Sequence, residues 1–225
     1  MKFSYKQISS SPWFKWLAPI LLIPSLLFNL YFLSLDKSDF STLVLEVLDG
    51  DTLLLEQDVR LRLRQLDAPE LEFCAGEESQ AFLEDLVKGE RVVIKEKILD
   101  QTGRAMALVY LNGDLINQAV IEAGWGRYHH DQTVATDILR ELGDKAKADK
   151  IGLYSPECYQ TENLDKPKCN IKGNIDPSNS SNKIYHLPGC VHYETTIVEK
   201  DRGEEWFCTE AEAKKAGYVK SKRCP

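Results

Sequence analysis

Residues 47–70 constrain the fold of this chain more than any other stretch. They open with the acidic turn Asp49-Gly50-Asp51, which lies between two apolar runs. A turn of this kind between apolar runs predicts a β-hairpin. From Val59 onward leucine alternates with arginine, and this alternation is typical of a half-buried strand. The sequence therefore predicts that a third strand follows the hairpin.

The third strand leads into the acidic sequence Asp67-Ala68-Pro69-Glu70. Pro69 has no amide hydrogen and cannot continue a strand ladder, so we expect two carboxylates at an exposed strand end. Arginines of the same strand bring cationic groups to this place. Acidic and cationic groups at the ends of short strands suit a metal-assisted attack on a phosphodiester.

These residues resemble the staphylococcal-type nuclease (thermonuclease) family. The family signature pairs V-[IL]-D-G-D-T, which begins here at Val47, with a downstream R-x4-D-x-P-E that begins at Arg62. The pair Gly103-Arg104 and the apolar patterns around it follow in the order of the family. The resemblance covers about residues 41–155, which is half of the 225-residue chain.

The hydrophobic periodicity predicts an α+β domain over the same residues. Short strands with interspersed helices suit a five-stranded OB-type β-barrel with about three helices, which is also the fold that the resemblance implies. Strands are expected at 43–48, 51–56, 59–66, 91–98 and 105–111, and helices near 77–88, 115–123 and 134–150.

The resemblance implies a calcium site formed by Asp51, Asp67 and the main-chain carbonyl of Ala68. Oxygen ligands from a turn and a strand end suit a hard cation. Many relatives have threonine where Ala68 stands, but a main-chain ligand survives that change. For Asp49 two interpretations stay open, a second metal-site acid and a residue that forms the turn.

The resemblance also implies three catalytic residues. Glu70 would act as general base toward the attacking water, whereas its alternative is a solvated loop acid. Arg62 and Arg104 would clamp the phosphate through the planar guanidinium fork and neutralise charge in the transition state. Arg60 and Arg64 alternate with leucine on the same strand, and we expect them to be solvated.

The surroundings of this site depart from the family pattern. Gln101 and Thr102 replace a lysine and a tyrosine that the family uses near the nucleotide, so we expect lower affinity. The segment Tyr128-His129-His130 lies where the family places base-stacking tyrosines, and stacking of this kind tolerates any sequence. For Trp125, packing against the barrel or a helix is the favoured interpretation.

The distribution of charge limits how nucleic acid can bind. The chain has a net charge of −7, and residues 41–155 carry 13 basic and 22 acidic residues. An acidic domain cannot hold a polyanion through a general basic surface. Affinity must then come from a few local arginines and a bound cation, and we expect it to be weak and salt-sensitive.

The N-terminal residues 1–36 predict a transmembrane anchor. Residues 17–35 contain no charge, and Lys2, Lys6 and Lys15 precede them, which by the positive-inside rule places the N-terminus in the cytoplasm and the rest of the chain outside. A cleaved signal peptide, and with it a secreted form, is the alternative, although no small-x-small site follows the apolar run. Pro19 and Pro24 argue against a buried core helix.

Beyond residue 155 we expect a linker at 156–168 and a small ββα module at 169–225. The module resembles the zinc-binding module of the adaptive-response methylated-DNA repair proteins, but Ser221 occupies one of the four ligand positions. Disulfide bonds are the alternative in an oxidising compartment. Three cysteines lie in or just after the nuclease-like region and three lie in the tail, so complete pairing requires one bond between the two groups. The groups are Cys74, Cys158 and Cys169, and Cys190, Cys208 and Cys224. If the module binds zinc, Cys208 would replace Ser221 as the fourth ligand, and the ligands would be His186, Cys190, Cys208 and Cys224.

The sequence as a whole predicts a membrane-anchored, extracytoplasmic, Ca²⁺-dependent endonuclease that acts on DNA or RNA. A second interpretation is a binding module, in which the same barrel without catalysis recruits nucleic acid or a protein partner to the membrane. The complete set of predicted catalytic residues favours the enzyme, and the acidic surface favours the binding module. Both interpretations share the same fold.

Overall fold

The computed structural model describes residues 40–177 and 179–224. Within these residues, no helix is both long and apolar enough to cross a bilayer. The predicted membrane anchor at 1–36 lies outside the described part of the chain.

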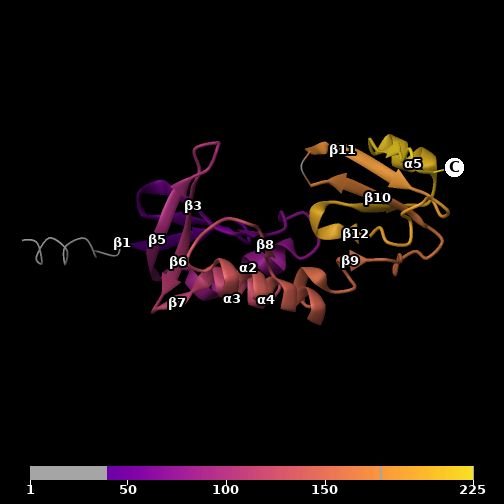
Figure 1. Cartoon of the computed structure of the whole chain (residues 1–225). Coiled ribbons are helices and arrows are strands. Elements are labelled where there is room, and N and C mark those ends of the chain that lie inside the picture. The colour runs from indigo at the N-terminus through magenta and orange to yellow at the C-terminus, as the bar shows by residue number, and fades with distance from the viewer. Residues whose placement is uncertain (1–39, 178, 225) are drawn as a thin grey trace, which may run out of the picture. The chain divides into compact units, whose positions relative to one another are not determined.

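Five strands form a closed barrel (Figure 1). Its neighbours follow the order β3-β2-β1-β5-β6, and a parallel pairing between β3 and β6 closes it. Leucines at alternate positions of β2 and β3 are buried, as their two-residue period requires for one face of a strand. The predicted five-stranded barrel is confirmed. The strands are β1 (Phe40–Val47), β2 (Thr52–Leu55), β3 (Val59–Leu63), β5 (Arg91–Leu99) and β6 (Ala105–Leu111), with the short β7 (Asp114–Leu115) at the edge of β6.

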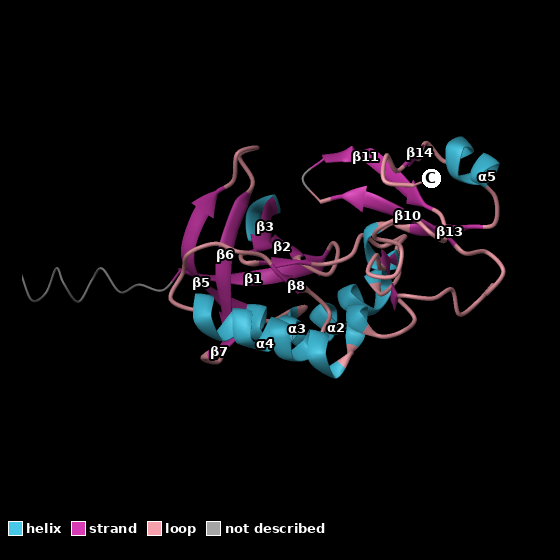
Figure 2. Ribbon diagram, turned by 45° about the vertical axis from the view of Figure 1, so that its right-hand side comes forward, coloured by secondary structure: helices cyan, strands magenta, loops and turns pink. Residues whose placement is uncertain are grey.

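Three helices cover one side of the barrel (Figure 2). They are α2 (Gly76–Val87), α3 (Ile116–Glu122) and α4 (Thr136–Asp149), close to the predicted ranges. Asn117 of α3 is fully buried, and its side chain accepts from the Val109 amide at 2.9 Å and donates to the Arg64 carbonyl at 2.8 Å. This side chain therefore fixes α3 to two barrel strands.

Short elements connect these parts. The strand β4 (Leu66–Asp67) follows β3 and pairs with β8 (Arg127–Tyr128), which follows α3. This pairing brings the acidic strand end beside the segment that contains the two histidines. The described residues also contain three short 3₁₀ helices: η1 (Glu56–Asp58), η2 (Gly152–Tyr154) and η3 (Lys200–Arg202).

The C-terminal module is a four-stranded sheet in the order β13-β10-β11-β14, with one helix against it (Figure 2). The helix of the predicted ββα module is confirmed, and it begins with a capping box that Thr209 and Glu212 form. The predicted ββα module has two strands, whereas the sheet has four. One added strand, at residues 171–176, contains glycine and polar residues and lacks a clear alternation of apolar and polar residues. The other, at residues 219–220, is only two residues long. The elements are β10 (Ile171–Asp176), β11 (Asn179–His186), β13 (Glu205–Phe207), α5 (Glu210–Lys215) and β14 (Val219–Lys220).

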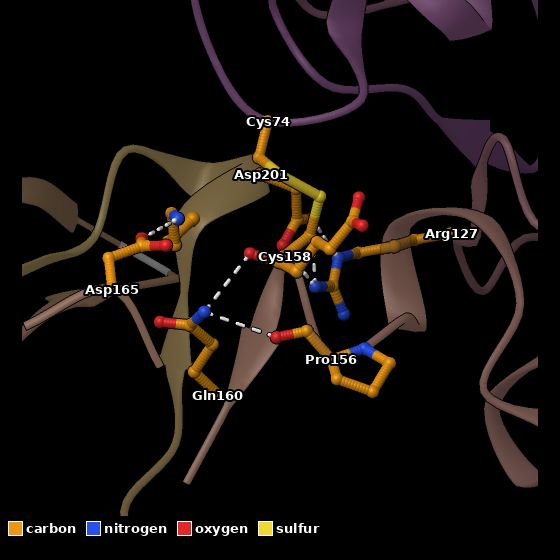
Figure 3. Close-up of a disulfide and its surroundings, with 9 residues drawn as sticks. Cys74, Arg127, Pro156, Cys158, Gln160, Asp165 and Asp201 are labelled. Carbon is orange, nitrogen blue, oxygen red and sulfur yellow. Dashed lines mark hydrogen bonds and ion pairs between the residues drawn. A yellow bond between two sulfur atoms is a disulfide. The ribbon is translucent and has the colours of Figure 1, made fainter. Parts of the chain in front are cut away.

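The segment that we predicted as a linker contains β9 (Tyr159–Gln160), which pairs with β12 (Val198–Glu199). Close by, Arg127 forms a two-point ion pair with Asp201, with both donor–acceptor distances at 2.9 Å (Figure 3). The Asp201 side chain is 2% exposed. A buried charge of this kind requires a partner, so Arg127 connects the barrel to the module.

Each of the six cysteines forms a disulfide bond. The pairs are Cys74–Cys158, Cys169–Cys208 and Cys190–Cys224.

The predicted zinc site is therefore not formed. His186 lies close to Cys190 and Cys224, but Cys208 is bonded to Cys169. Zinc binds thiolates, and a sulfur in a disulfide has no thiolate to offer. The alternative of disulfides is the one that the structure has, and Cys169–Cys208 is the bond that joins the two groups of cysteines.

Candidate active site

The acidic turn between β1 and β2 is packed against the rest of the domain. The Asp49 side chain accepts a hydrogen bond from the Asp51 amide at 2.9 Å. This bond supports the interpretation of Asp49 as a residue that forms the turn. A Cβ atom at Gly50 would lie 2.0 Å from the Ser79 hydroxyl oxygen and 2.7 Å from the Ala68 Cβ. Only glycine permits this approach, and the approach places Asp51 inside the domain.

Asp51 is 2% exposed and is held by three donors. Its Oδ1 accepts from the Thr52 hydroxyl at 2.8 Å, and its Oδ2 accepts from the Ala68 amide at 3.0 Å and from Arg62 Nη2 at 2.7 Å. Burial raises the pKa of Asp51 to about 7, and the charge of Arg62 opposes this shift. The buried acid thus depends on a nearby positive charge for its ionised form.

Arg62 of β3 brings the two predicted metal-site acids together. The same Nη2 atom that pairs with Asp51 also pairs with Asp67. Two carboxylates that reach one cationic nitrogen from different segments can also share one metal ion. The Ala68 backbone lies beside them, since its amide binds Asp51. This oxygen-rich set fits the hard cation that the sequence predicts.

Arg104 is held by Asp100 across the turn between β5 and β6. Its Nε donates to Asp100 Oδ2 at 2.7 Å, while its side chain stays 62% exposed. Hydrogen bonds from the Thr102 side chain and the Arg104 amide hold the pKa of Asp100 well below its usual range. The bond to Asp100 raises the pKa of Arg104, and Asp51 and Asp49 add to this shift. The guanidinium group is therefore within electrostatic reach of the buried acid.

A solvent-open cleft gathers most of the predicted site. Arg62, Asp67 and Arg104 line it together with His129 and His130. Asp51 lies next to the cleft through its ion pair with Arg62. The structure thus brings together four of the predicted side chains and the predicted histidines.

Glu70 is not among the residues that line this cleft. It is exposed in the loop between β4 and α2. Its carboxylate makes no hydrogen bond or ion pair with any residue of the described ranges. The backbone alone therefore determines where this side chain can reach.

One expectation about the arginines is wrong. Arg64 is 8% exposed and not solvated. It pairs with Asp131 and donates to the carbonyls of Glu96 and Gln132, both at 3.0 Å. Its partners are far away in the sequence, so the leucine–arginine alternation cannot reveal them. Arg60 is exposed as expected.

Other residues of the site have a local signal that the sequence analysis missed. Asp100 precedes Arg104 by four residues and caps the turn between them, and an aspartate before a Thr-Gly turn is typical of this role. Trp125 packs against the main hydrophobic core, as favoured. Tyr128 also packs there, which leaves His129 and His130 as the exposed rings of its segment.

Comparison with known proteins assigns the family. The family model for the staphylococcal nuclease homologues matches residues 60–156. "Protein ParB" of Escherichia coli is 32% identical over 126 residues, which cover 50% of this chain and 71% of that protein. An "Uncharacterized endonuclease" of Haemophilus influenzae is 31% identical over 144 residues, 60% of this chain and 78% of that protein. The "Micrococcal nuclease" of Shigella flexneri is 32% identical over 133 residues, 52% and 75% of the two chains. The chain belongs to the staphylococcal nuclease family.

Proposed function

We propose that this chain is a Ca²⁺-dependent nuclease that hydrolyses phosphodiester bonds within DNA or RNA. The convergence of Asp51 and Asp67 on one nitrogen of Arg62, in a cleft that also contains Arg104, carries this proposal. A binding module has no need for two acids and two arginines in this arrangement. The family assignment supports hydrolysis of nucleic acid.

Calcium would be held by the carboxylates of Asp51 and Asp67 and by the Ala68 carbonyl. When bound, it supplies positive charge that stabilises the negative charge of the phosphate. The ion would add positive charge beside the two acids, which both pair with Arg62.

The two arginines would stabilise the transition state. Attack on phosphorus concentrates negative charge on the non-bridging oxygens, so hydrogen bonds to these oxygens strengthen as the reaction proceeds. Asp100 occupies Nε of Arg104, and the two terminal nitrogens of Arg104 make no hydrogen bond within the described ranges. They are therefore available to two phosphate oxygens at once.

Glu70 would act as the general base. Its carboxylate takes a proton from the attacking water, the water oxygen forms the new bond to phosphorus, and the bond to the leaving oxygen of the nucleotide breaks. Glu70 follows the metal-site residue Asp67 by three positions, so the base would stand on the loop that leaves β4 directly after a metal ligand. The absence of any described partner leaves the Glu70 carboxylate free for this role.

Substrate binding would be weak and salt-sensitive, because the domain is acidic and the cleft has few cations. His129 and His130 line the cleft and offer ring faces for stacking. Stacking does not depend on base identity, which suits an enzyme without sequence preference.

A cleavage assay distinguishes the enzyme from the binding module. The full chain in detergent is incubated with circular DNA, linear DNA or RNA, in Ca²⁺ or in EDTA. We expect cleavage in Ca²⁺ that EDTA suppresses, and cutting of the circle identifies endonuclease action. Retention of nucleic acid without cleavage in Ca²⁺ would support the binding module and contradict the proposal.

We also propose that the chain is anchored in the plasma membrane by residues 1–36, with the nuclease domain outside the cytoplasm. The pairing of every cysteine supports an oxidising compartment. Protease added to intact cells, or to spheroplasts where an outer membrane intervenes, is expected to digest the domain. A domain that stays intact in spheroplasts while an external marker is digested would contradict this orientation.

A further inference from the structure

The loop that carries Glu70 is held at its far end by the C-terminal half of the chain. This loop, residues 68–75, connects β4 to α2. Cys74 in the loop is bonded to Cys158 (Figure 3). Cys158 is 3% exposed, and its carbonyl accepts from the Lys200 amide at 2.8 Å. The disulfide thus connects the loop to a buried point that η3 also contacts.

A second contact holds the same loop. The Phe73 ring packs against Gly203, where a Cβ atom would lie 2.6 Å from the tip of the ring. Gly203 has a φ of +75°, a backbone conformation that side chains other than glycine rarely adopt. The missing Cβ leaves room for the ring, and the backbone conformation is a second reason for glycine at this position. The module therefore touches the loop at the residue before Cys74, while the disulfide holds Cys74 to the segment that precedes the module.

The loop transmits these contacts to Glu70 because it is compact. The Phe73 amide donates to the Glu70 carbonyl at 2.9 Å, and the Gly76 amide donates to the Phe73 carbonyl at 3.1 Å. The Glu70 carbonyl also lies against Gly76, where a Cβ atom would be 2.1 Å from it. Hence Glu70 cannot move independently of residues 73–76.

The anchoring point is itself rigid. Arg127 reaches Asp201 with its guanidinium (Figure 3). It also pairs with Glu199 at 3.3 Å. The same guanidinium lies over the Tyr154 ring, 5.1 Å from its centre. These contacts fix η3 and the segment around Cys158 to the barrel.

From these contacts we infer that Cys74, Cys158 and Phe73 are positioning residues of the nuclease site. The C-terminal module, through Gly203, and the segment before it, through Cys158, hold the Glu70 loop in its working position. The Glu70 carboxylate has no described partner of its own, so the backbone of this loop is what locates it. The inference rests on the proposed role of Glu70 as the base.

The test compares two disulfide bonds, one that ends in the loop and one that lies entirely within the module. Cys74→Ser/Cys158→Ser opens the bond to the loop, and Cys190→Ser/Cys224→Ser opens a bond within the module as the control. A displacement of about 1 Å can cost about 10² in rate. For a loosened loop we expect kcat to fall about tenfold, with KM and calcium affinity unchanged. Asp51 and Asp67 lie outside the loop, and the third proposed ligand, Ala68, stands at its first residue, where its amide stays bound to Asp51. The control is expected to keep the wild-type kcat.

A double-mutant cycle separates positioning of Glu70 from a general loss of stability. In a Glu70→Gln background the base is already absent, so opening Cys74–Cys158 should change kcat by less than about twofold if the effect passes through Glu70. An equal fall in both backgrounds would overturn the inference. A kcat that stays at the wild-type value when the bond is opened would overturn it as well.

Two further measurements keep the test decisive. If the variant without Cys74–Cys158 does not fold, Phe73→Ala serves in its place, because it retains the disulfide and removes the contact with Gly203. It should lower kcat in the chain that has Glu70 and change kcat by less than about twofold in the Glu70→Gln background. Hydrogen exchange at the Phe73 and Gly76 amides reports the loop without any substrate. We expect faster exchange there and unchanged exchange in the barrel, and unchanged loop exchange would overturn the inference. Absence of cleavage by the wild-type chain would instead refute the proposed function.

Discussion

Glutamine at position 70 is expected to lower kcat by about 10²–10⁴, the range typical for the loss of a general base. The substitution keeps the size of the side chain and removes its ability to accept a proton from water. Glu70 is exposed and its carboxylate forms no described hydrogen bond, so the fold should be unaffected. Single-turnover cleavage of DNA in saturating Ca²⁺ measures the effect directly, because product release then plays no part.

Glu72→Gln is the matched control for this variant. Glu72 is an exposed acid in the same loop, and the Glu72→Gln variant is expected to retain wild-type turnover. Calcium affinity, measured by titration calorimetry without substrate, should be the same in both variants. Unchanged turnover in Glu70→Gln would assign the base to another group and leave Glu70 as a solvated loop acid.

The barrel could be predicted because its information is local. The two-residue period of β2 and β3 and the acidic turn before β2 each depend on residues close in sequence. Asp51, Arg62 and Asp67 then meet because barrel closure brings their strand ends together. The short elements of the module lack this signal. β14 has two residues, and its partner β11 lies more than thirty residues earlier in the chain.

Other parts of the site depend on contacts that no local pattern contains. The alternation in β3 gives Arg60, Arg62 and Arg64 equal weight, yet one is exposed, one pairs with the metal-site acids and one is buried. The difference comes from Asp131, 67 positions after Arg64. Cysteine spacing likewise leaves the disulfide pairing open. The support of the Glu70 loop by Cys158 and Gly203 is therefore visible only in three dimensions.

Lysine at position 104 is expected to lower kcat by about 10²–10³, the range for losing one transition-state donor of this type, even though it preserves the charge. Arg104 uses Nε to bind Asp100 and keeps two terminal nitrogens for the phosphate. Lysine has one nitrogen for both tasks. Asp100 accepts strongly at this place, as its depressed pKa indicates, so the ammonium group would be held there and drawn away from the substrate.

Two comparisons show whether the fork or the charge is responsible. Arg60→Lys, at an exposed position on the same barrel, is expected to leave kcat unchanged. Arg104→Lys/Asp100→Asn weakens the competing acceptor, so it should recover part of the lost rate if capture by Asp100 contributes to the loss. Full activity of Arg104→Lys alone would reduce Arg104 to a general positive charge, because a point charge would then serve as well as a planar guanidinium with two donors directed at the phosphate.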